Sequence, residues 1–96
     1  MYSSAAGEQA VFTFTGQNVR WVGDRVFDGG IANVYLDGVL VTVVDTHAPM
    51  QEAFQGPLFV ATGLTPGDHS LTIEVTGTAN PNSSGTRIVV DAFDVY

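Results

Sequence analysis

Apolar and polar residues alternate along several short stretches of this chain, and this two-residue period constrains the fold more than any other feature. Residues 69–76 place an apolar side chain at every second position, and residues 10–15 do the same. Successive side chains of a β-strand point to opposite faces, so the pattern indicates strands with one buried face. The predicted core positions are Phe12, Phe14, Val34, Leu36, Leu71, Ile73 and Val75.

Turn residues separate the alternating stretches at short intervals. Asp37-Gly38 is a tight-turn signal, and residues 63–68 contain Pro-Gly. No stretch of useful length shows helical periodicity. The expected fold class is therefore all-β, an antiparallel β-sandwich of about seven or eight strands. The predicted strands cover residues 10–15, 19–22, 31–36, 40–45, 58–61, 69–76 and 86–95.

The length and charge of the chain limit its organisation and its partners. Ninety-six residues predict a single domain, 1–96, in which residues 1–9 form a polar lead-in. The net charge is -7, and all three basic residues are arginines, so no basic patch for nucleic acid can form. The same balance disfavours anionic membranes, and no apolar segment approaches transmembrane length. Cysteine is absent, which excludes disulfides and thiolate metal sites.

Loop length divides the sandwich into two unequal ends. If consecutive strands run antiparallel, the turns near Gly16, Asp37 and Pro66 fall at one end. The long loops 23–30, 46–57 and 77–86 then share the other end. Long loops on a rigid scaffold commonly carry binding sites, so we expect any ligand to bind at the long-loop end. The alternative is that long loops are merely tolerated there.

The long loops contain aromatic and polar side chains that suit a sugar ligand. Aromatic rings pack against the C–H faces of sugars, while carboxylates, guanidinium groups and amides bond to hydroxyls. Each residue type also has a structural interpretation: a phenylalanine that tucks under its own loop, an arginine that pairs with a carboxylate, or an asparagine that forms a turn. The candidate ligand-binding residues are Asp24, Arg25, Phe27, Asp28, Gln51, Phe54, Asn80 and Asn82.

Two other candidates are weighed outside that set. Trp21 is the only tryptophan, but it is in register with Val19 in a predicted strand, which favours core burial over sugar stacking. His47 and His69 fall at opposite ends, so they cannot share a metal or a catalytic site. With no nucleophile motif and no room for a deep cleft with paired carboxylates, we expect no enzymatic activity.

The segments FTFTGQNVRWVG, GIANVYLDGVLVTVVD and GLTPGDHSLTIEVTGTANPNSSGTRIVVDAFDVY resemble the galactose-binding-domain-like jelly rolls of secreted bacterial proteins, which include many carbohydrate-binding modules. The resemblance covers residues 10–96 and implies an extracellular or cell-surface location, no catalysis, and glycan binding by end loops or by a concave sheet face. Members of this group usually begin with a further strand region. Its absence here predicts an open sheet edge.

The same resemblance raises the question of a structural calcium. Asp91 alternates with Val89 and Phe93 in the last predicted strand, so its carboxylate is expected on the apolar side, where it needs a partner. Arg20, a tyrosine hydroxyl or backbone N–H groups are the partners available in the chain, and a cation is the alternative that the resemblance implies. Asp24 and Asp28 also offer oxygen ligands, but their spacing matches no calcium-loop motif. No other cofactor is expected.

Two functions follow from these features. The first is a non-catalytic carbohydrate-binding accessory module of a secreted or cell-surface bacterial protein, with a glycan as partner. The alternative is a structural or adhesive surface module that binds no small molecule and self-associates, most simply as a homodimer through a sheet edge. The sequence does not identify the glycan.

Overall fold

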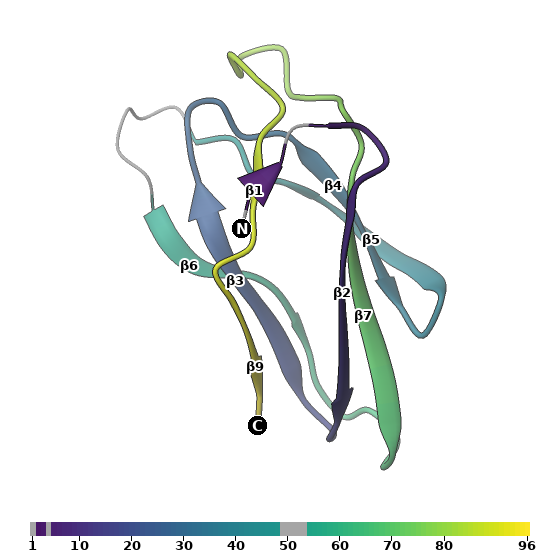
Figure 1. Ribbon diagram of the computed structural model, residues 1–96. Coiled ribbons are helices and arrows are strands. Elements are labelled where there is room, and N and C mark those ends of the chain that lie inside the picture. Colours follow the sequence, from purple (N-terminus) through teal and green to yellow (C-terminus); the bar gives the residue numbers. More distant parts are fainter. Residues whose placement is uncertain (1, 4, 49–53) are drawn as a thin grey trace.

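The chain folds into two antiparallel sheets that face each other as a sandwich, which confirms the predicted fold class (Figure 1). The computed structural model describes residues 2–3, 5–48 and 54–96. The strands are β1 (Tyr2–Ser3), β2 (Gln9–Thr15), β3 (Val19–Arg25), β4 (Ile31–Leu36), β5 (Val39–Asp45), β6 (Phe54–Ala61), β7 (Asp68–Val75), β8 (Ile88–Val89) and β9 (Ala92–Val95).

One sheet has four strands in the order β2-β7-β4-β5, and the other has three in the order β6-β3-β9. The short strands β1 and β8 form a separate antiparallel pair beside them. Within the described residues, no helix is long and apolar enough to span a membrane. Both sheets turn their apolar faces inward, as the two-residue period requires.

The core lies between the two sheets and contains the predicted residues. Phe14, Val34, Leu71, Ile73 and Val75 are buried, and Phe12 and Leu36 pack against them while partly buried. Trp21 from β3 is fully buried, and its indole N–H donates a hydrogen bond to the Val89 carbonyl oxygen at 3.2 Å. The tryptophan is thus a core residue, and no sugar ring can stack on it.

Several predicted strand boundaries were wrong. β3 continues to Arg25 and pairs over its last residues with the beginning of β6, which starts at Phe54. Asp24, Arg25 and Phe54 therefore lie on strands, whereas the sequence placed them in loops. Gly23 makes the longer β3 possible, because a Cβ there would overlap the Val89 carbonyl oxygen.

The two ends of the chain also differ from expectation. The predicted lead-in contributes β1, which pairs with β8, and Gln9 already begins β2. The expected last strand is broken: β8 ends at Val89, and β9 begins at Ala92. The break at Val90 and Asp91 interrupts the alternation on which the inward orientation of Asp91 was predicted, and Asp91 is exposed.

The division into two ends is confirmed. At one end, Val26 forms a parallel bridge with His47, and Gly29 forms another with Arg87, so the three long connections touch one another. At the other end lie the turns 16–18, 37–38 and 62–67 (Figure 1). In the 37–38 turn both Asp37 and Gly38 have positive φ, which suits a two-residue hairpin between twisted strands.

Candidate functional site

Two glycines bring the long connections together. A Cβ on Gly29 would overlap the backbone of Thr46, and one on Gly30 would overlap the carbonyl group of Thr86. Thr46 is fully buried and donates its hydroxyl to the Gly30 carbonyl oxygen at 2.8 Å. The missing side chains of this glycine pair let the neighbouring loops approach its backbone closely.

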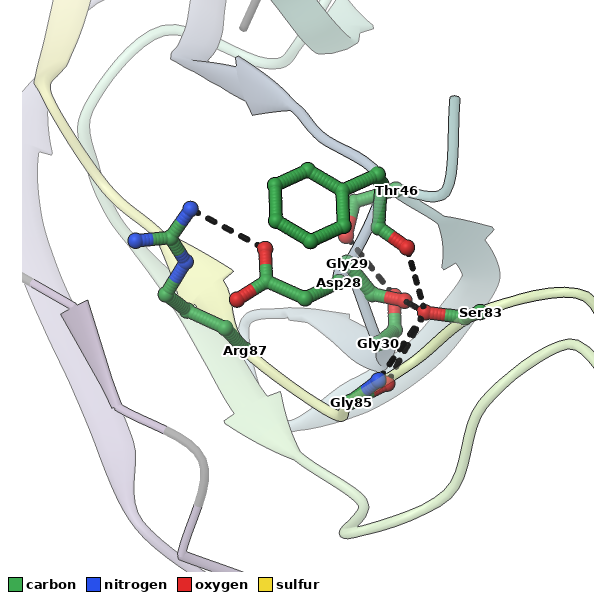
Figure 2. Close-up of polar contacts among 8 residues, drawn as sticks. Asp28, Gly29, Gly30, Thr46, Ser83, Gly85 and Arg87 are labelled. Atoms are coloured by element: carbon green, nitrogen blue, oxygen red, sulfur yellow. Dashed lines mark hydrogen bonds and ion pairs between the residues drawn. The ribbon is translucent and has the colours of Figure 1, made fainter. Parts of the chain in front are cut away.

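Ser83 fastens the 76–87 connection to the 26–30 loop. Its hydroxyl lies 2.7 Å from the Gly29 carbonyl oxygen and 3.0 Å from that of Gly85, as Figure 2 shows. A hydroxyl with one proton donates best to the nearer oxygen, so Gly29 is its main acceptor. Ser83 therefore shapes the loops, and its hydroxyl is not available to a ligand.

Asp28 forms an ion pair with Arg87, with 3.0 Å between the Arg87 guanidinium and Asp28 Oδ1 (Figure 2). The sequence interpretation paired a loop carboxylate with Arg25, and that pairing is wrong. The Arg25 guanidinium instead donates to the carbonyl oxygen of Asp45 at 2.7 Å. Both arginines thus hold neighbouring segments in place, and Asp28 points to Arg87.

Asp24 and Asp91 form a carboxyl pair on the flank of the sandwich. Burial raises the pKa of Asp24, the hydrogen bond to Asp91 and its negative charge add to this, and Arg87 opposes it. Among the described residues, no three acidic or histidine side chains gather where they could hold a metal ion. Within the described part of the chain, the carboxylate beside Asp91 is that of Asp24, and this pair alone is not a cluster of three such ligands that could hold the suggested calcium.

A hollow of about 420 Å³ opens at the long-loop end. Its lining residues are Phe27, His47, Asn82 and Ser84. Phe27 is 46% exposed, so its ring is accessible from solution. The volume falls within the range of small-ligand sites.

Within the described residues, the polar side chains of this hollow make no hydrogen bond to the protein. The backbone N–H groups of His47, Asn82 and Ser84 all donate hydrogen bonds. In contrast, their imidazole, amide and hydroxyl groups form no hydrogen bond within the described part of the chain. An exposed aromatic ring beside three polar side chains can pack against the apolar face of a sugar while the polar groups bond to its hydroxyls.

A larger hollow, of about 520 Å³, lies at the short-turn end. Its polar groups are largely paired with one another: Thr15 donates to Asp68 at 2.6 Å, and His69 lies 2.7 Å from Asp37. Its one aromatic residue, Phe14, is buried. Despite its size, this hollow offers little to a ligand, so we consider the long-loop hollow the better candidate site.

The predicted site residues therefore separate. Phe27 and Asn82 line the hollow, whereas Asn80 shapes its loop by accepting the Asn82 N–H at 2.9 Å and donating to the Asp45 carboxylate at 3.2 Å. Gln51 lies outside the described residues. His47 and Ser84 also line the hollow, although neither is among the candidate ligand-binding residues predicted from the sequence. The only available signal was the end assignment of His47, because a loop residue has no periodicity that shows where its side chain points.

Comparisons with known proteins add context. No protein-family model matches the chain. Over 72 residues it is 40% identical to the A type blood N-acetyl-alpha-D-galactosamine deacetylase of Flavonifractor plautii. Over 72 residues it is also 36% identical to the A type blood alpha-D-galactosamine galactosaminidase of the same organism. Each match covers 75% of this chain but only 9% and 6%, respectively, of these relatives.

A structural match supports the fold over nearly the whole chain. A xanthan lyase from Paenibacillus contains a region that superposes on 94% of this chain with a TM-score of 0.63. The sequence identity is 18%, and the match covers 9% of the lyase chain. The chain is therefore a small β-sandwich domain that corresponds to a minor part of large bacterial enzymes of glycan chemistry.

Proposed function

We propose that this domain is a non-catalytic carbohydrate-binding accessory module of a secreted or cell-surface bacterial protein. The observation that carries the proposal is the long-loop hollow, where the exposed Phe27 ring stands beside the side chains of His47, Asn82 and Ser84, which form no hydrogen bond to other described residues. Sugar recognition needs this combination of an apolar platform and hydroxyl partners.

The comparisons support this assignment and suggest the first ligands to test. A match confined to 9% and 6% of two enzymes is what an accessory domain attached to a separate catalytic region would produce. Both enzymes are named for galactosamine-containing blood-group sugars. Galactosamine and N-acetylgalactosamine, free and at the ends of glycans, are therefore the primary candidates.

A glycan array followed by isothermal titration calorimetry tests the proposal. Phe27→Ala and Asn82→Ala should each weaken binding by about 1–2 kcal/mol, because each removes one contact while every sugar hydroxyl bond only replaces a bond to water. Both residues are at the surface of their loops, so thermal unfolding should change little.

Thr13→Ala, in the hollow at the short-turn end, is the matched control and should leave the affinity unchanged. If the affinity changes in Thr13→Ala but not in Phe27→Ala or Asn82→Ala, the ligand binds at the short-turn end and the proposed site is wrong. If the domain binds no glycan on the array, the proposed carbohydrate-binding function is wrong.

A further inference from the structure

Strand β5 is an open edge of the four-stranded sheet. It pairs with β4 on one side, and no described strand pairs with its other side (Figure 1). The backbone N–H and C=O groups along that side are therefore available to another strand. The sequence analysis predicted an open sheet edge without identifying the strand, and β5 is an edge of this kind.

The side chains of β5 are apolar and exposed. Val39, Leu40, Val41 and Val43 are between 46% and 64% exposed. The register places Val43 opposite Asn33 and Leu40 opposite Tyr35, so these side chains continue the outer face of the sheet. From residue 39 to residue 44 there is no charged residue. An edge of this kind is normally blunted in a monomer.

The other edge strands have such protection. β6 contains Pro57, which cannot donate to a further strand, and β9 is four residues long with Asp94 in an ion pair with Arg20 at 2.8 Å. β2 exposes the polar residues Gln9, Thr13 and Thr15. In β5 the only such device is the irregularity in its pairing between Val34 and Tyr35 of β4.

We propose that β5 pairs antiparallel with β5 of a second copy of this chain, joining the two four-stranded sheets across a two-fold axis. A chain with a net charge of -7 repels its own copies wherever carboxylates meet, and residues 39–44 form a strip without them. A strand edge is also self-complementary in the antiparallel direction, as a two-fold interface requires.

The bounds of β5 select the register of this pairing. If the axis passes through Val41, only residues 39–43 can pair, because the strand begins at Val39 after the 37–38 turn, whereas an axis through Thr42 pairs all seven residues of Val39–Asp45. If the axis passes through Thr42, Asp45 lies opposite Val39, and no carboxylates face each other. The second register is therefore assigned, with Thr42 opposite its own counterpart.

Sedimentation velocity over a concentration series tests the interface. The native chain should show a concentration-dependent dimer, and Val43→Glu should raise the dimer Kd by roughly tenfold or more, because it sets a carboxylate in the apolar strip. Val11→Glu adds the same charge at a similarly exposed valine on the opposite edge, and it should leave the Kd unchanged. A native chain that remains monomeric up to about 1 mM overturns the proposal. An equal rise of the dimer Kd in Val43→Glu and Val11→Glu also overturns it.

Disulfide trapping tests the register independently of these variants. The chain contains no cysteine, so Thr42→Cys introduces the only thiol. Directly opposite residues of an antiparallel pair lie about 4.5–5.5 Å apart at Cα, within disulfide reach. Oxidation should convert Thr42→Cys into a covalent dimer and leave Val11→Cys largely monomeric. If Thr42→Cys stays monomeric after oxidation, the assigned register is wrong. If β5 binds unrelated extended peptides but no second copy of the chain, the assignment of its partner is wrong.

Discussion

His69 connects two turns at the end of the sandwich opposite the candidate site. Its Nδ1 lies 2.7 Å from Asp37 Oδ2, and its Nε2 lies 2.6 Å from the Thr65 carbonyl oxygen. A carbonyl oxygen and an ionised carboxylate only accept hydrogen bonds, so both contacts are hydrogen bonds at once only when the ring is protonated on both nitrogens. The Thr65 carbonyl, and after it the Asp37 carboxylate, raise the pKa of His69.

This geometry predicts a stability that depends on pH. The pKa of His69 is higher in the folded chain than the ordinary value of about 6.5, so its stabilising contribution is fully present below that pH. The contribution is lost as the pH rises through the raised folded value. Thermal unfolding measured from about pH 6 to pH 9 should show Tm falling toward the alkaline side.

Two variants isolate the effect. His69→Gln should lose this part of the pH dependence, whereas His47→Gln, at the other end of the molecule, should retain it. Equal slopes of Tm against pH for the native chain and His69→Gln would show that the pair contributes nothing. At acid pH, the stability contributed by Asp37 depends on pH in the opposite direction. His69 lowers the pKa of Asp37, so this contribution is lost as the pH falls through the lowered value.

The elements at the long-loop end show what a sequence pattern can and cannot predict. Alternation identified the strands and the buried faces, since a period of two residues needs only local geometry. The boundaries of β3 and β6 were missed because Asp24 and Arg25 are polar residues held in a strand by pairing with β6, a partner remote in sequence. Asp91 was misplaced because it lies in the break between β8 and β9, where the alternation of strand side chains does not apply.

The close approach of Gly30 to Thr86 leads to a prediction for this element. Gly30→Ala should destabilise the fold by about 1–3 kcal/mol, because the new methyl group must displace backbone rather than a flexible side chain. Urea unfolding followed by Trp21 fluorescence measures the change. Gly56→Ala is the control: it lies in β6, has nothing near the added Cβ, and should cost far less. If Gly30→Ala and Gly56→Ala lower the unfolding free energy by similar amounts, the loops move apart at little cost and the prediction is wrong.

At the scale of the whole molecule, one core joins both sheets. Trp21 and Val19 from the three-stranded sheet belong to the same buried cluster as Val34 and Leu71 from the four-stranded sheet. Neither sheet can lose its partner without exposing its inner face. A single core of this kind is typical of small domains that unfold in one step.

Unfolding should therefore be cooperative across the molecule. Denaturation curves from Trp21 fluorescence and from far-UV circular dichroism should share one midpoint. Leu71→Ala should lower the unfolding free energy by about 2–5 kcal/mol, because it opens a cavity between the sheets. Both midpoints should therefore move to lower denaturant concentration by the same amount. If the fluorescence midpoint moves and the dichroism midpoint does not, the sheets unfold separately.

The fold and the end of the molecule that carries the long loops were predictable, but the composition of the candidate site was only partly so. Phe27 and Asn82 were identified by residue type and loop position. His47 and Ser84 line the hollow because the Val26–His47 bridge and the Ser84 N–H bond to the Phe27 carbonyl draw their loops together. Such contacts depend on three loops packing at once, and no single stretch of sequence encodes them.

The position of the C-terminus has a practical consequence. The Tyr96 N–H donates to the Asn18 carbonyl oxygen at 3.1 Å, and the Asn18 amide donates back to the Tyr96 carbonyl oxygen at 2.6 Å. The chain thus ends beside the 16–18 turn, away from the long loops (Figure 1). A biotin or fluorescent reporter attached beyond Tyr96 would leave the hollow facing solution, so the domain can be mounted on a sensor surface or used as a staining reagent without masking its candidate site.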